Sequence, residues 1–218
     1  MIANLVKKDV LLVRKNIALL LGLSILVPFL IMILDKESAY VQIGPFAFLY
    51  MAVLADLSFM QTVATEEEKS PKAIALLCAA PYSRRSYVIA KYICYLIFCA
   101  ACIAAYSIIA LIFPRISLLS LVEVQLLLLI GIFIYGIYTP VAIKYGIAKA
   151  RLVFMFGIMI VCLAPTIIVR TLHLNMDSAL ALLQNPPAIV APILLGAGIV
   201  ILILSTIISI RIFEKKEL

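Results

Sequence analysis

Residues 88–113 read VIAKYICYLIFCAACIAAYSIIALIF, a run in which Lys91 is the only charged side chain. A helix of about 20 apolar residues is long enough to cross the hydrocarbon core of a bilayer. Five further apolar runs, each bounded by charged or turn-forming residues, occupy residues 17–34, 44–64, 119–143, 152–169 and 188–210. The sequence therefore predicts an all-α integral membrane protein, in which six transmembrane helices form one domain over residues 1–218.

The composition excludes a soluble domain. Of the 218 residues, 66% are hydrophobic and 13% are charged, with a mean hydropathy of +1.23, whereas about a quarter of the residues in a soluble domain are charged. The net charge of +7 does not indicate nucleic-acid binding, because 15 of the 18 Lys and Arg fall on one side of the predicted spans. Only Lys36, Arg115 and Arg170 fall on the other side. The positive-inside rule therefore predicts that both termini are cytoplasmic.

Residues 1–16 have the pattern of a basic amphipathic helix. Apolar residues recur at spacings of three and four, at Ile2, Leu5, Val6, Val10 and Val13. Polar and basic residues lie between them, at Asn4, Lys7, Lys8, Arg14 and Lys15. Such a helix lies in the headgroup plane, where apolar burial and attraction to anionic lipid act together. We expect an interfacial helix in contact with membrane lipid, and the sharper alternative is that this helix also contacts a soluble partner.

The cytoplasmic connection at residues 65–87 reads TEEEKSPKAIALLCAAPYSRRSY. Thr65 and Glu68 have the spacing of a capping box, which predicts that the acidic run lies in a first helical turn. Ser70 and Pro71 predict the start of a short helix that ends before Pro81, and Ser83 is placed to cap the helix of the third span. Exposing the apolar side chains of such a short helix to water is unfavourable. The pattern therefore indicates a surface to which a partner docks.

This connection resembles that of a known family. The order of an acidic run, a short helix at 73–80, Pro81, Ser83-Arg84 and Lys91 is similar to permease subunits of bacterial type-2 (ABC-2) ABC exporters. Within that class the chain is similar to the small permeases of peptide exporters, such as those of the staphylococcal phenol-soluble-modulin exporter. Residues 69–72 depart from the family, which often has Gly-Thr-Leu-Glu there.

The resemblance implies an assembly of two permeases, a second copy or a paralogue, with two cytoplasmic ATPase subunits in a bacterial plasma membrane. ATP and Mg²⁺ would bind to the partner ATPase, and the cargo would be an amphipathic peptide of the toxin or antimicrobial type. A lipid, heme-like or drug cargo is the alternative, and a non-catalytic membrane scaffold or sensor is an alternative of another class. The residues expected to bind the ATPase are Glu66, Glu67, Glu68, Lys69, Ile74, Leu76, Leu77, Pro81, Arg84 and Arg85.

Two sets of polar residues within the spans are candidates for a substrate path. One is a stripe in the second span, Ser58, Gln61 and Thr62, and the other consists of Tyr92, Tyr95, Tyr135 and Tyr138 at helical spacing in the third and fourth spans. Helix packing is the alternative for the tyrosines. Asp56 falls on the opposite side of its helix from the stripe, and we expect it to hydrogen-bond to a neighbouring helix.

The chain has no pattern of a catalytic or metal site. It lacks the GxxxxGK[ST] motif of ATP-binding loops. His173 is its single histidine, and the five cysteines lack the spacing of a zinc site. We therefore expect no catalytic residue, metal or cofactor in this chain. A short extracellular helix at 179–183, between the fifth and sixth spans, completes the predicted fold.

Overall fold

The computed structural model describes residues 2–34, 43–69, 83–113, 118–152, 154–157, 159–160 and 189–215. Its helices are α1 (Ile2–Leu12), α2 (Arg14–Leu34), α3 (Ile43–Glu68), α5 (Arg84–Ile112), α6 (Leu121–Tyr145) and α9 (Val190–Glu214). Short helical stretches follow α6 between residues 147 and 160, and none of the described residues lies in a strand. The all-helical fold predicted from the sequence is thereby confirmed.

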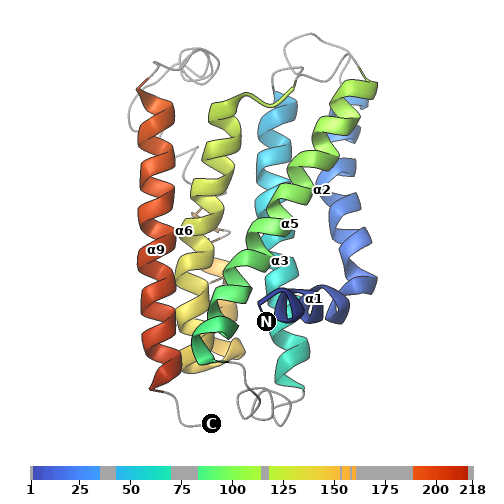
Figure 1. Ribbon diagram of the computed structural model, residues 1–218. Coiled ribbons are helices and arrows are strands. Elements are labelled where there is room, and N and C mark those ends of the chain that lie inside the picture. The colour runs from blue at the N-terminus through green and yellow to red at the C-terminus, as the bar shows by residue number, and fades with distance from the viewer. Residues whose placement is uncertain are drawn as a thin grey trace.

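The long helices run alongside one another, and α1 lies across them toward one end (Figure 1). Four of them, α3, α5, α6 and α9, contain stretches long and apolar enough to cross a membrane. The predicted first span is helical from Arg14 to Leu34. The predicted fifth span lies only partly within the described residues, and the helix expected at 179–183 lies outside them. The total of six spans therefore stays a prediction.

Hydroxyl caps set the start of two spans. The Ser83 side chain accepts a hydrogen bond from the Ser86 backbone N–H at 3.1 Å, so the predicted cap of α5 is confirmed. At the opposite end of the bundle, Ser120 and Glu123 form a reciprocal capping box at the start of α6. Each cap satisfies backbone donors that a helix start leaves without a partner.

The predicted position of the acidic run in a first helical turn is wrong. Helix α3 continues without a break through Glu68, so the run forms its last turn. The Thr65 hydroxyl donates to the Gln61 carbonyl at 2.8 Å, a bond to the preceding turn of the same helix. The last turn of α3 can hold these acidic residues because one of them, Glu67, pairs with Lys8 of α1 and Lys91 of α5.

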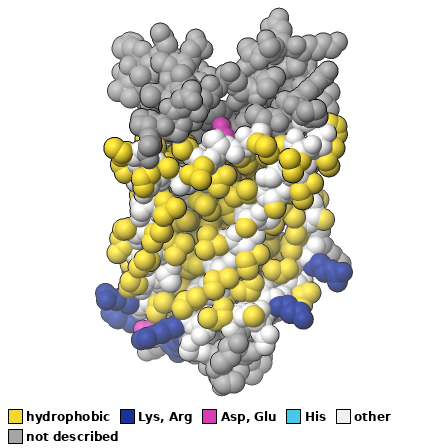
Figure 2. All heavy atoms as spheres, turned by 45° about the horizontal axis from the view of Figure 1, so that its top comes forward, with side chains coloured by type: hydrophobic (Ala, Val, Ile, Leu, Met, Phe, Trp, Pro, Cys, Tyr) yellow, Lys and Arg dark blue, Asp and Glu magenta, His cyan; other side chains and the backbone are white. Residues whose placement is uncertain are grey.

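Apolar side chains cover the middle of the molecule, and Lys and Arg gather toward one end of it (Figure 2). Helix α9 packs mainly on α6, and α2 packs mainly on α3. Aromatic rings fill the space between α3 and α5, where Phe59 and Phe98 stack with centroids 4.4 Å apart. Large apolar side chains of α2, α5 and α9 remain exposed on the outside, as expected for helices that face lipid.

Candidate functional site

Helix α1 buries an acidic residue in its apolar face. Asp9 is 1% exposed, and Leu5, Val6 and Val13 are buried with it. Since residues four apart share a face of a helix, Asp9 lies between Leu5 and Val13 on the side that meets the bundle. An unpaired carboxylate in that position would be costly, so the packing of α1 depends on a cation within reach.

Two cations meet this requirement. The Lys91 ammonium lies 3.1 Å from Oδ2 of Asp9 and 2.8 Å from Oε2 of Glu67. The Lys8 ammonium lies 3.1 Å from Oδ1 of Asp9 and also pairs with Oε1 of Glu67. We call Lys8, Asp9, Glu67 and Lys91 the charge cluster. It joins α1, α3 and α5 at a single point.

The charge cluster is electrically balanced, with two ammonium groups and two carboxylates. Tyr87 completes it: its hydroxyl donates to Oε2 of Glu67 at 2.7 Å, and both ammonium groups lie within 5.5 Å of its ring centroid. Burial alone would lower the pKa of Lys8, but the carboxylates of Glu67 and Asp9 outweigh it, so its pKa is raised above the ordinary 10.5. Lys8 is therefore a cation at physiological pH.

The same end of α5 also holds the end of α9. The Arg84 guanidinium donates to the Glu214 carbonyl at 2.9 Å, and Arg85 pairs with the Glu214 carboxylate at 2.7 Å. A guanidinium at the end of a helix satisfies carbonyls that have no partner within that helix. One turn further along α5, the Tyr87 ring stacks on Phe213. The start of α5 is thus tied to α1, α3 and α9 together.

A family model described as "ABC-2 family transporter protein" matches residues 4–214. The chain belongs to this family. Comparison with curated proteins and with solved structures gave no match. Membership makes the chain a multi-pass membrane permease of an ABC exporter; it implies an ATPase partner and, in many members, a dimer. Membrane domains of this kind are generally non-catalytic, since a separate subunit hydrolyses ATP. The resemblance is confirmed at this level.

The residues expected to bind the ATPase differ in their surroundings in this ABC-2 permease. Glu66, in the last turn of α3, and Lys69, directly after that helix, are at the surface and form an ion pair. Glu67 is buried in the charge cluster, and Arg84 and Arg85 contact α9. The Glu68 side chain and the apolar residues of the connection lie outside the described part of the chain, namely Ile74, Leu76, Leu77 and Pro81.

The candidate path residues of the permease fall into two separate arrangements. In the stripe, the Thr62 hydroxyl donates to the Ser58 carbonyl at 2.7 Å. All three side chains of the stripe are half-buried. The four tyrosines are buried together: the rings of Tyr95 and Tyr135 stack at 4.7 Å, and Tyr92 and Tyr138 adjoin Tyr135. The tyrosines therefore pack α5 against α6 in this conformation.

Asp56 is the second fully buried acid. It is 1% exposed, and within the described residues neither carboxylate oxygen has a hydrogen-bond partner in the protein. It faces the Cys99 thiol of α5. The Tyr95 hydroxyl, beside the same part of α5, also lacks a partner among the described residues. The expected hydrogen bond from Asp56 to a neighbouring helix stays a prediction.

Sequence reasoning missed the charge cluster as a unit. Lys8 was placed on the polar face of an amphipathic helix, Asp9 was placed on neither face, and Lys91 was noted as the only charge of its span and as part of a family pattern, without a partner. A usable signal exists: Asp9 interrupts the apolar stripe, four residues after Leu5 and four before Val13. An acid on an apolar stripe predicts a buried cation from another segment. Lys91, the single charge in residues 88–113, is the natural candidate.

Proposed function

We propose that the chain is the membrane subunit of an ATP-driven exporter of amphipathic peptides and that residues 66–85 bind its ATPase. The charge cluster is the observation that supports this assignment. Glu67 lies in the last turn of α3 and Lys91 lies about two turns into α5, so the cluster joins the two sides of the connection between these helices. A force applied to the connection by an ATPase would reach both spans at once.

The charge cluster also extends this transmission to α1. Two ion pairs, Lys8 with Glu67 and Asp9 with Lys91, hold α1 to the same pair of spans. Elements linked by several buried charges resist separate displacement, because separating them would leave charges without partners in a low dielectric. We therefore propose that α1 and the basic ends of α3 and α5 move as one body when ATP closes the ATPase dimer.

The peptide cargo is supported by the amphipathic character of the buried tyrosine cluster. Tyrosine offers an apolar ring and a hydroxyl that bonds polar atoms. In this conformation the Tyr92 hydroxyl is hydrogen-bonded to Ser205 and Ser209 of α9. A movement of α5 relative to α9 would release that hydroxyl and expose a surface suited to a peptide with one apolar face. The Ser58, Gln61 and Thr62 stripe would supply further polar contacts.

The test of ATPase binding uses Leu76→Asp, with Leu76→Ile as the matched control. A charge in the apolar part of the connection should abolish co-purification of the permease with its ATPase, while the isoleucine variant should retain it. If Leu76→Asp left the complex intact and its peptide-stimulated ATP hydrolysis normal, the assignment of residues 66–85 would be wrong.

The cargo is tested separately, in proteoliposomes containing the permease and its ATPase. A synthetic amphipathic helical peptide should stimulate ATP hydrolysis several-fold, and a scrambled peptide of the same composition should not. Stimulation by a lipid or by haem, with no response to amphipathic peptides, would replace the peptide assignment with one of those cargo classes.

A further inference from the structure

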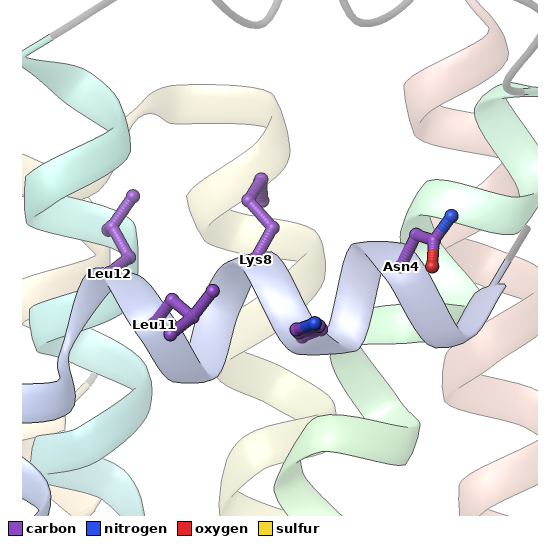
Figure 3. A pocket seen from close by; sticks show the side chains of 5 residues that line it. Asn4, Lys8, Leu11 and Leu12 are labelled. Carbon is purple, nitrogen blue, oxygen red and sulfur yellow. The ribbon is translucent and has the colours of Figure 1, made fainter.

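The outward side of α1 carries a shallow hollow of about 510 Å³, lined by Asn4, Lys7, Lys8, Leu11 and Leu12. Figure 3 shows the order along the helix: Asn4 lies at one end, Lys8 in the middle, and Leu11 and Leu12 at the other end. Leu11 is 54% exposed and Leu12 is 40% exposed. The hollow therefore combines a polar, cationic part with an apolar part that nothing else in the described chain covers.

Its charge is of one sign. The lining contains two lysines and no acid, because the only acid of α1, Asp9, is buried on the opposite side. Lys7 is exposed and lies outside the charge cluster, so its ammonium is available to a ligand. The ammonium groups of Lys7 and Lys8 and the side-chain amide of Asn4 can donate hydrogen bonds to the oxygens of a phosphate group.

The apolar part indicates what the phosphate is attached to. Leu11 and Leu12 lie where α1 meets α2, and α2 presents Leu19 and Leu23 on its exposed side. Exposed apolar side chains of a membrane helix therefore follow the apolar end of the hollow along the chain. A soluble phosphate would use only the lysines, whereas a phospholipid would use the lysines with its headgroup and the leucines with its acyl chains.

Lys8 connects this hollow to the charge cluster. Its side chain is 28% exposed, and it lines the hollow while its ammonium pairs with Asp9 and Glu67. A phosphate bound beside Lys7 would attract the same ammonium and weaken its hold on Glu67. Glu67 stands at the start of the connection to which we assign ATPase binding, so occupancy of the hollow would change the link between α1 and α3.

We propose that this hollow binds the phosphate headgroup of an anionic phospholipid and that the bound lipid loosens the pair between Lys8 and Glu67. The lipid thereby regulates the permease at the point where α1 meets the ATPase-binding connection. The regulatory half of the proposal rests on the proposed function, whereas the binding half does not.

The binding test uses the purified permease in detergent, with retained lipid measured by native mass spectrometry. Phosphatidylglycerol should be retained over phosphatidylcholine, and Lys7→Gln should weaken its retention about fivefold, as expected for one lysine at an anionic surface. Lys149→Gln, which removes the same charge from another exposed site, should leave retention unchanged. Equal effects of the two variants would overturn the proposal, and so would displacement of the lipid by inorganic phosphate at similar concentration.

The regulatory test compares ATP hydrolysis by the permease and its ATPase in phosphatidylcholine vesicles with and without phosphatidylglycerol. Hydrolysis should rise several-fold with phosphatidylglycerol in the wild type and stay level in Lys7→Gln. Loss of ATPase co-purification in Lys7→Gln, with normal lipid retention, would make this face a protein-docking surface and overturn the lipid assignment. Failure of the ATPase to respond to any peptide would affect only the proposed function, because lipid retention is measured without it.

Discussion

Two acids are equally buried in this bundle, and their surroundings are opposite. Asp9 and Asp56 are each 1% exposed. Asp9 has an ammonium group 3.1 Å from each of its oxygens, whereas Asp56 forms no ion pair within the described residues and faces the Cys99 thiol. Depth of burial therefore does not decide what a membrane-embedded acid contributes. The presence of a fixed counter-charge does.

The physical consequence differs for the two positions. At the charge cluster each group is paired with two groups of opposite sign, so removing any one leaves the buried set with an unbalanced charge, and stability depends on all four. At Asp56 a neutral replacement would leave no counter-charge without a partner, so it should change stability little. Three pairs of variants test this contrast.

The largest effect is expected from Lys91→Met. The variant leaves two buried carboxylates, Asp9 and Glu67, with Lys8 as their only cation, and should lower the free energy of unfolding by about 3–5 kcal/mol. Denaturant unfolding of the purified permease in detergent measures it. Lys7→Met, an exposed lysine on the same helix as Lys8, serves as the control and should change stability by no more than about 0.5 kcal/mol.

A double variant sharpens this result. Asp9→Asn combined with Lys91→Met removes one charge of each sign, so the remaining Lys8 and Glu67 are again balanced. The double variant should lose less unfolding free energy than the two single variants lose in sum, as expected for groups in one network. Simple additivity would mean that the four charges do not act as a unit.

The second pair compares the two acids directly. Asp9→Asn should cost about 2–3 kcal/mol, because it removes a charge to which Lys8 and Lys91 are both paired. Asp56→Asn should stay within about 1 kcal/mol of the wild type, because an amide replaces a carboxylate that has no partner to lose. Equal losses of unfolding free energy would show that the Asp56 carboxyl group has a partner after all, such as the Cys99 thiol that it faces.

The sequence predicted three of the long apolar helices well, because a run of about 20 apolar residues is itself a local pattern. The runs at 88–113, 119–143 and 188–210 correspond to helices Arg84–Ile112, Leu121–Tyr145 and Val190–Glu214. The bounds differ mainly at the basic end, where helices continue through charged residues that hydropathy places outside the membrane. Local hydroxyl caps, such as Ser83, were also predictable because they depend on residues three positions apart.

The charge cluster was not predictable in the same way because its partners are distant in sequence. Lys8 and Glu67 are separated by 59 positions, and no local pattern links them. The same spacing of threonine and glutamate also occurs in the interior of helices. The positions of Thr65 and Glu68 therefore could not show that α3 continues through both residues. Asp9 was not placed on either face of the predicted amphipathic helix, because a pattern of one apolar and one polar face has no position for an acid on the apolar side.

The smallest and cleanest contrast is between Tyr87→Phe and Tyr95→Phe. Both rings are stacked, Tyr87 on Phe213 at 5.2 Å and Tyr95 on Tyr135 at 4.7 Å, and phenylalanine keeps both contacts. The Tyr87 hydroxyl donates to the Glu67 carboxylate, whereas the Tyr95 hydroxyl has no partner among the described residues. Tyr87→Phe should therefore cost about 1.5 kcal/mol in unfolding free energy, and Tyr95→Phe should be close to neutral. Because packing is conserved in both variants, a cost at Tyr95 equal to that at Tyr87 would show that the region around Asp56 is hydrogen-bonded after all, and the contrast between the two buried acids would fail.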